Sequence, residues 1–135
     1  MKDISVDATI ENLEKVVEFI NTELESFDCN SKTQMEIAIA VDEIFSNISH
    51  YAYGDKVGQA TILIGFDKES KEVTLRFIDK GVPYNPLDKE DPDVSLSADE
   101  RHEGGLGIYI VKKTMDKVEY EYKDNQNILT IKKKI

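Results

Sequence analysis

The stretch VDEIFSNISHYAYG, residues 41–54, combines the apolar pattern of a packed helix with two polar side chains beside it. Its apolar side chains recur every three or four residues, at Val41, Ile44, Phe45 and Ile48. That period is typical of a helix with one face on a core. Glu43 and Asn47 are also four residues apart, so both project from one side of the helix. A carboxylate can accept a proton and an amide oxygen can bind Mg²⁺, although chance also gives this pair on a solvated helix edge.

The size and composition favour one compact domain covering residues 1–135. The net charge of −10 would repel a phosphate backbone, so we expect no nucleic-acid partner. No apolar run approaches the ~18 residues of a membrane span, so we expect no membrane partner. The N-terminus lacks the apolar core of a signal peptide, and the single cysteine, Cys29, excludes an internal disulfide. We therefore expect a cytoplasmic protein.

The segments around residues 41–54 predict a mixture of strands and helices. In order, we expect a strand at 4–8, helices at 10–24 and 32–51, strands at 59–67 and 71–79, a loop at 80–105, a helix at 106–117, and strands at 118–123 and 127–134. Thr9 and Ser31 are the candidate N-caps of the first two helices. Because helices do not separate the strands regularly, this order predicts an α/β (α+β) two-layer sandwich. Its three helices would cover one face of a mixed, mainly antiparallel sheet.

A second motif, Asp79-Lys80-Gly81-Val82-Pro83, follows the strand VTLRFID. A carboxylate at a strand end can accept a hydrogen bond from an exocyclic amine such as that of adenine. Gly81 would let the backbone turn closely past a flat ring. The alternative is an ordinary strand-terminating turn, since these residue types are common in turns.

A third motif, Gly104-Gly105-Leu106-Gly107, opens the helix expected at 106–117. Free N–H groups at a helix N-terminus bind anions, and glycines let phosphate oxygens approach. The motif is neither a P-loop nor a dinucleotide fingerprint, because its spacing fits neither. A flexible hinge is the alternative. Together with the long loop before it, however, the three motifs supply a base, a metal ligand, an adenine acceptor, a cover and a phosphate cradle, which a nucleotide site needs.

These motifs resemble those of the anti-sigma-factor serine kinases of bacterial partner-switching systems. The kinases belong to the superfamily of gyrase, Hsp90, histidine-kinase and MutL ATP-binding domains, the Bergerat or GHKL fold. VDEIFSNISHYAYG is similar to the N box, IDKGVPYNPL to the first glycine box, and GGLGIYIVKKTMDKVEYEY to the second with its helix and strand. NILTIKKK resembles the closing strand. The resemblance covers nearly the whole chain.

The resemblance implies roles for individual residues. Glu43 would be the general base or would orient the attacking hydroxyl, and Asn47 would hold Mg²⁺ against the ATP phosphates. Asp79 would bind the adenine amino group, with Gly81 beside the ring and Thr130 nearby. The phosphates would face the glycine-rich helix start, formed by Gly104, Gly105, Leu106 and Gly107.

Further residues are implied with less detail. The segment from about Asn85 to Glu103 would be the ATP lid. His50 stands where related domains often carry a basic residue near the phosphates, with a structural role as the alternative. Pro83 replaces the usual second glycine of the first glycine box, and the lid is rich in acids.

The function implied by the resemblance is an ATP- and Mg²⁺-dependent protein serine/threonine kinase that acts as an anti-sigma factor. It would phosphorylate a STAS-like anti-anti-sigma protein, sequester an RNA polymerase sigma factor and form a homodimer. Two alternatives remain open. One is a nucleotide-binding switch module that sequesters a partner without phosphoryl transfer, and the other is an ATP-hydrolysing or histidine-kinase-type domain.

Overall fold

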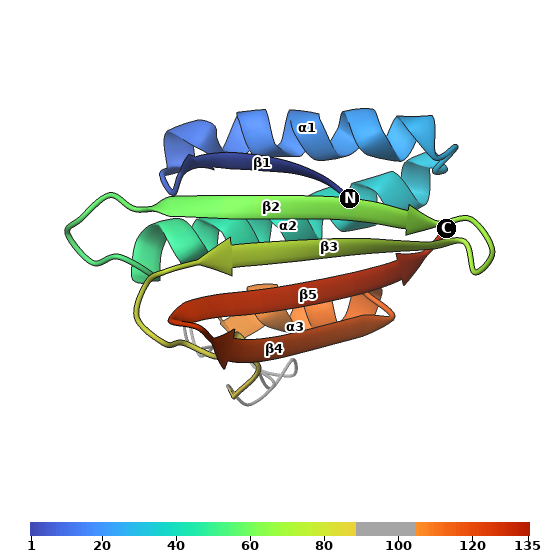
Figure 1. Ribbon diagram of the computed structural model, residues 1–135. Helices are drawn as coiled ribbons and strands as arrows, with labels where there is room; N and C mark the ends of the chain where they lie inside the picture. The colour runs from blue at the N-terminus through green and yellow to red at the C-terminus, as the bar shows by residue number, and fades with distance from the viewer. Residues whose placement is uncertain (89–104) are drawn as a thin grey trace.

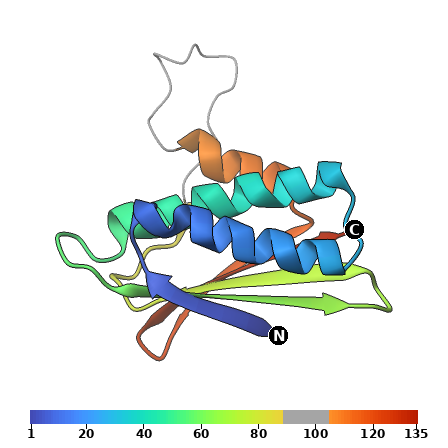
Figure 2. The same cartoon turned by 90° about the horizontal axis from the view of Figure 1, so that it is seen from above.

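The structure is a computed structural model that describes residues 1–88 and 105–135, apart from the side chains at positions 105 and 106. Its α-helices cover one face of a five-stranded sheet, as Figures 1 and 2 show from two directions. The described elements are β1 Lys2–Asp7, a 3₁₀ turn Ile10–Asn12, α1 Leu13–Ser26, α2 Ser31–Tyr51, β2 Gln59–Asp67, β3 Glu72–Asp79, a 3₁₀ turn Pro86–Asp88, α3 Gly105–Thr114, β4 Lys117–Lys123 and β5 Gln126–Lys134. The predicted two-layer α/β architecture is therefore confirmed.

The strand order is β1-β2-β3-β5-β4, and every described pair is antiparallel. The parallel pairing that a mixed sheet would need is thus not found among the described strands. Because β3 and β5 run in opposite directions at the centre of the sheet, the last residue of β3, Asp79, lies opposite Asn127 near the start of β5. The sheet topology therefore joins two distant polar residues at one end of the fold.

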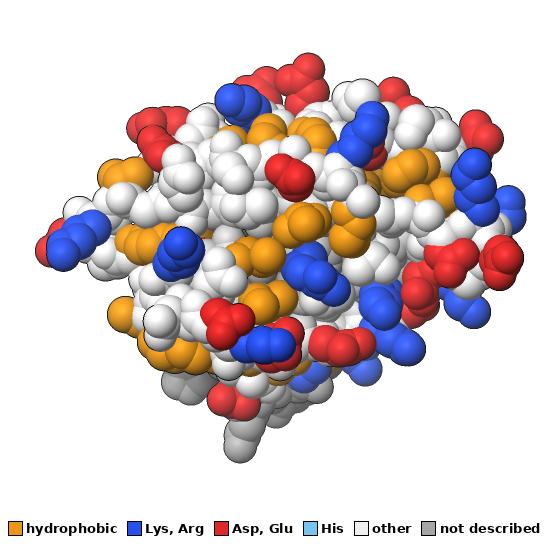
Figure 3. All heavy atoms as spheres, in the orientation of Figure 1, with side chains coloured by type: hydrophobic (Ala, Val, Ile, Leu, Met, Phe, Trp, Pro, Cys, Tyr) orange, Lys and Arg blue, Asp and Glu red, His pale blue; other side chains and the backbone are white. Residues whose placement is uncertain are grey.

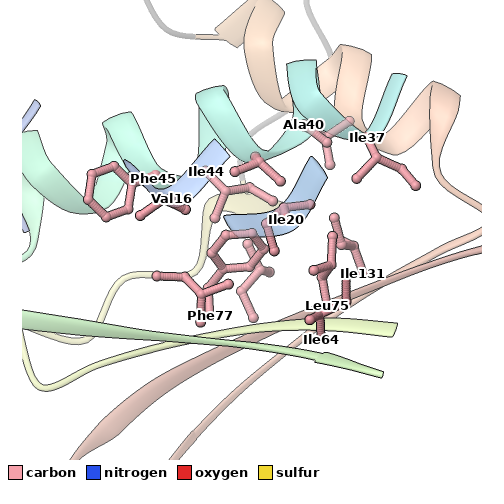
Figure 4. Packing of buried hydrophobic residues seen from close by; sticks show 14 of the residues in the cluster. Val16, Ile20, Ile37, Ala40, Ile44, Phe45, Ile64, Leu75, Phe77 and Ile131 are labelled. Atoms are coloured by element: carbon pink, nitrogen blue, oxygen red, sulfur yellow. The ribbon is translucent and has the colours of Figure 1, made fainter. Parts of the chain in front are cut away.

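The core lies between the helices and the sheet. Every second residue of β3 is buried, as a strand with one covered face requires: Val73, Leu75, Phe77 and Asp79. Figure 4 shows side chains of α2 and of the strands pointing toward each other, with Ile44 of α2 above Phe77 of β3. Asp79 is thus a charged residue at the end of an otherwise apolar, core-facing row.

The helix boundaries differ from those predicted. Asn30, not Ser31, caps α2: its extended backbone lets its side-chain oxygen accept a hydrogen bond from the N–H of Thr33 at 2.8 Å. Thr9 precedes the 3₁₀ turn rather than α1, which begins only at Leu13, and its side chain makes no capping hydrogen bond. α3 ends at Thr114, earlier than expected, since the N–H of Asp116 already bonds to β5. Within the described residues, no helix is long and apolar enough to cross a bilayer.

Candidate functional site

A pocket of about 470 Å³, counting its open mouth, lies between the C-terminal half of α2, the end of β3 and the first turns of α3. Most of its lining is apolar, which suits a flat, weakly polar ring system. The apolar lining residues are Ile44, Ile48, Ala52, Phe77, Val82, Pro86, Ile108 and Leu129. Its remaining lining residues, which carry polar groups, are Asn47, Asp79, Tyr84, Tyr120 and Asn127.

Among the described residues, Asp79 is the charged group that lines this pocket, and it is only 5% exposed. Its Oδ1 accepts hydrogen bonds from the backbone N–H of Gly81 and from Nδ2 of Asn127, both at 2.9 Å. Within the described residues, Oδ2 receives no hydrogen bond. Burial raises the pKa of the carboxyl group, and the two hydrogen bonds oppose that rise. The carboxylate therefore has one anchored oxygen and one oxygen available to a donor on a ligand.

The turn after Asp79 is packed on the end of α2. A Cβ at Gly81 would lie 2.1 Å from the carbonyl oxygen of Ala52, so only glycine fits here. The N–H of Val82 donates to that same oxygen at 2.9 Å, and the N–H of Lys80 donates to Oη of Tyr53 at 2.8 Å. Gly81 thus fixes the wall of the pocket through its contact with α2.

Glu43 and Asn47 lie on α2 as predicted, but they reach different places. Asn47 lines the pocket, whereas half-buried Glu43 lies against the first turn of α3. A Cβ at Gly107 would be 1.9 Å from Cδ of Glu43, so the missing side chain of Gly107 makes room for the carboxylate. The N–H groups of a first helical turn have no partners within their own helix, so such a turn can bind an anion. The fold therefore brings the carboxylate to the helix end.

The donor set also fits a divalent cation. In the described residues there is no cluster of three or more His, Cys, Asp or Glu side chains. A fully protein-made metal site is therefore not found there, but Mg²⁺ typically uses one or two protein oxygens together with phosphate oxygens and water. The amide oxygen of Asn47, with the carboxylate of Glu43 one turn away, matches that mode.

Thr130 and His50, which were both predicted near the nucleotide, do not line this pocket. Thr130 is on the helix-free face of the sheet, where its hydroxyl accepts a hydrogen bond from Nε of Arg76 at 3.4 Å. Thr130 lines a separate hollow on that face. Its predicted place near the base is therefore wrong for this fold, because side chains of β5 alternate between faces and Asn127 has the inward register. Charged and apolar side chains are mixed on that helix-free face (Figure 3). His50 is exposed, contacts the ring of Tyr51 at 6.0 Å between centroids, and does not line the pocket.

Other predictions fall outside the described residues. Gly104, the side chain of Leu106 and the greater part of the predicted lid, 89–103, belong to this group. The described beginning of that segment includes Pro86, which lines the pocket. Gly105 is the first residue of α3, in agreement with its predicted place at a helix start.

Sequence reasoning missed three polar groups of the pocket, in Tyr84, Tyr120 and Asn127. Asn127 is 6% exposed and lies opposite Asp79 in the β3–β5 pair. The available signal was the alternation of β5, because an asparagine in an inward register needs polar partners. That signal is usable only once the pairing of β5 with β3 is known.

Comparison with known proteins shows the family and the fold of the chain. The family described as "Histidine kinase-like ATPase domain" matches residues 6–133. The serine-protein kinase RsbW of Bacillus mycoides is 29% identical over 101 residues, which cover 72% of this chain and 62% of that protein. The serine/threonine-protein kinase BtrW of Bordetella bronchiseptica is 26% identical over 102 residues, covering 76% and 71%.

A solved structure shares the fold. The crystal structure of the RsbU and RsbW domains of Rv1364c from Mycobacterium tuberculosis superposes with a TM-score of 0.66 at 13% identity, over 99% of this chain and 32% of that one. The resemblance to anti-sigma serine kinases is thereby confirmed at the level of family and fold. The chain belongs to the histidine kinase-like ATPase domain family.

Proposed function

We propose that the protein is an ATP- and Mg²⁺-dependent protein serine/threonine kinase of the RsbW type, with residues 1–135 forming one ATP-binding domain. The contact between Glu43 and Gly107 carries the proposal, because it sets a carboxylate beside an anion-binding helix end at the edge of an apolar pocket. A module that only bound nucleotide would have no need of that carboxylate.

The described residues suit successive parts of the reaction. The base would enter the apolar pocket and donate its amino group to Oδ2 of Asp79. The triphosphate would extend toward the first turn of α3, whose N–H groups stabilise the developing negative charge. Glu43 would orient the hydroxyl of the acceptor serine or threonine and take its proton. Mg²⁺, held in part by Asn47, would supply charge neutralisation at the phosphates when bound.

The partners are inferred from the relatives. The matched relatives are named serine-protein kinases, which supports a protein acceptor, and the chain spans only 62% of the RsbW relative from Bacillus mycoides. We infer a STAS-like anti-anti-sigma acceptor, a sequestered sigma factor, a homodimer and a cytoplasmic location.

The test is transfer of labelled γ-phosphate from ATP to a STAS-type protein of the same organism. Wild type is compared with Glu43→Gln, which keeps the size of the side chain and removes the base. We expect the variant to keep its ATP affinity and to lose transfer by a factor of about 10²–10⁴. Tight ATP binding without transfer by the wild type would support the switch module instead, and phosphate release to water without any acceptor would support the ATPase.

A further inference from the structure

The side chain of Asn127 has every hydrogen-bonding position filled. Its Nδ2 donates to Oδ1 of Asp79 and to the carbonyl oxygen of Val82, both at 2.9 Å. Its Oδ1 accepts from the N–H of Tyr84 at 3.1 Å and from Oη of Tyr120. An amide offers two donors and two lone pairs, so this buried group is fully satisfied. The donors on one side and the acceptors on the other leave a single orientation for the amide.

That orientation determines how Asp79 presents its carboxylate. Nδ2 of Asn127 and the N–H of Gly81 both hold Oδ1, so the carboxylate cannot rotate without losing two hydrogen bonds. Oδ2 is left for a ligand in a pocket that Asp79 and Asn127 both line. Asn127 also supports the ionised form, because its hydrogen bond opposes the rise in the pKa of Asp79 that burial causes.

The same amide fixes the chain that leaves β3. Val82 and Tyr84 both line the pocket, and both are tied to Asn127 through their backbone. Tyr120 joins the network from the edge strand β4. Asn127 thus connects Asp79 to the pocket wall formed by the chain after β3 and to the edge strand β4.

We propose that Asn127 is the positioning residue that makes this site selective for a purine with an exocyclic amino group, by holding Asp79 with Oδ2 toward the base. This inference rests on the proposed nucleotide site and adds the residue that sets its base selectivity. Asn127 acts through Asp79, because removal of its amide takes away one of the two hydrogen bonds that hold Oδ1 of the carboxylate.

The test compares the affinities of ATP and of purine riboside triphosphate, which lacks only the amino group. The wild type should bind ATP roughly tenfold or more tightly than the analogue, because one hydrogen bond to a charged group has an effect of that size. Asn127→Leu, of similar size, should lower ATP affinity about tenfold and the affinity of the analogue less than about threefold. Thr130→Val is the matched control, since it removes a buried polar group of the same strand on the opposite face, and both affinities should be unchanged.

The outcomes separate the two proposals. Equal losses for both nucleotides in Asn127→Leu would overturn the inference, because a purely structural residue has that effect. If Asn127→Leu does not fold, Asn127→Val, whose side chain has no hydrogen-bond donor, must show the same selective loss. A wild type without preference for ATP also overturns the inference. Selective ATP binding without phosphorylation of any protein leaves the inference standing and refutes only the kinase.

Discussion

Gly107→Ala should separate phosphoryl transfer from nucleotide binding. A methyl group at this position would lie 1.9 Å from Cδ of Glu43 and 2.0 Å from its Oε1. Ordinary contact begins near 3.4 Å, so the carboxylate would have to retreat by about 1.5 Å. The obstacle is the end of a flexible side chain, which can turn away at a cost of about 0.5–1.5 kcal/mol.

The magnitude follows from that displacement. A shift of about 1 Å in a catalytic group costs roughly 10²-fold in rate, so we expect transfer to fall by about that factor or more. Alanine is favoured over glycine inside a helix by about 0.5–1 kcal/mol. The free energy of unfolding should therefore stay within about 1 kcal/mol of wild type. ATP affinity should fall much less than transfer, because Gly107 does not line the pocket proposed for the base.

The assay measures the rate of transfer to the STAS-type acceptor at saturating ATP, together with ATP affinity and urea denaturation. Gly107→Ala is made alone and in a Glu43→Ala background. If Gly107 acts by leaving room for Glu43, the second substitution adds almost nothing to the loss. Transfer at the wild-type rate in Gly107→Ala, or a further hundredfold loss in the Glu43→Ala background, would refute the reasoning.

Four other substitutions test the site and the framework that carries it. In Gly81→Ala the new Cβ would lie 2.1 Å from the carbonyl oxygen of Ala52, a backbone atom that cannot turn away. The free energy of unfolding and the affinity for ATP should therefore both fall, as calorimetry and titration can measure. Asp79→Asn should weaken ATP binding yet raise stability at neutral pH. Burial raises the pKa of Asp79 above its unfolded-state value, so its charged form is a cost to folding that is absent below the unfolded-state pKa, grows between the two pKa values and is complete above the folded-state pKa. Urea denaturation should show that Asp79→Asn is more stable than the wild type at neutral pH but not at acidic pH. An equal gain at both pH values would show that the buried charge of Asp79 is not the cause. Asn30→Ala should cost about 1 kcal/mol of stability through the lost cap of α2, while Ser31→Ala should cost less, as denaturation curves can show.

The predictable and unpredictable parts of the site differ for physical reasons. Asp79 was predictable because the alternation of β3 ends in a carboxylate followed by turn residues. The face of β5 was not, because NILTI has apolar residues in both registers and only the pairing with β3 turns Asn127 inward and Thr130 outward. The role of Gly107 also depends on tertiary structure, since its neighbour Glu43 is on another helix.

The most direct test of the nucleotide site is a crystal structure with Mg²⁺ and the non-hydrolysable analogue AMP-PNP. The account predicts the adenine amino group within hydrogen-bond distance of Oδ2 of Asp79, and the triphosphate directed at the first turn of α3 beside Glu43 and Asn47. Density for the analogue elsewhere on the protein, with this pocket empty and Glu43 away from the phosphates, would contradict it.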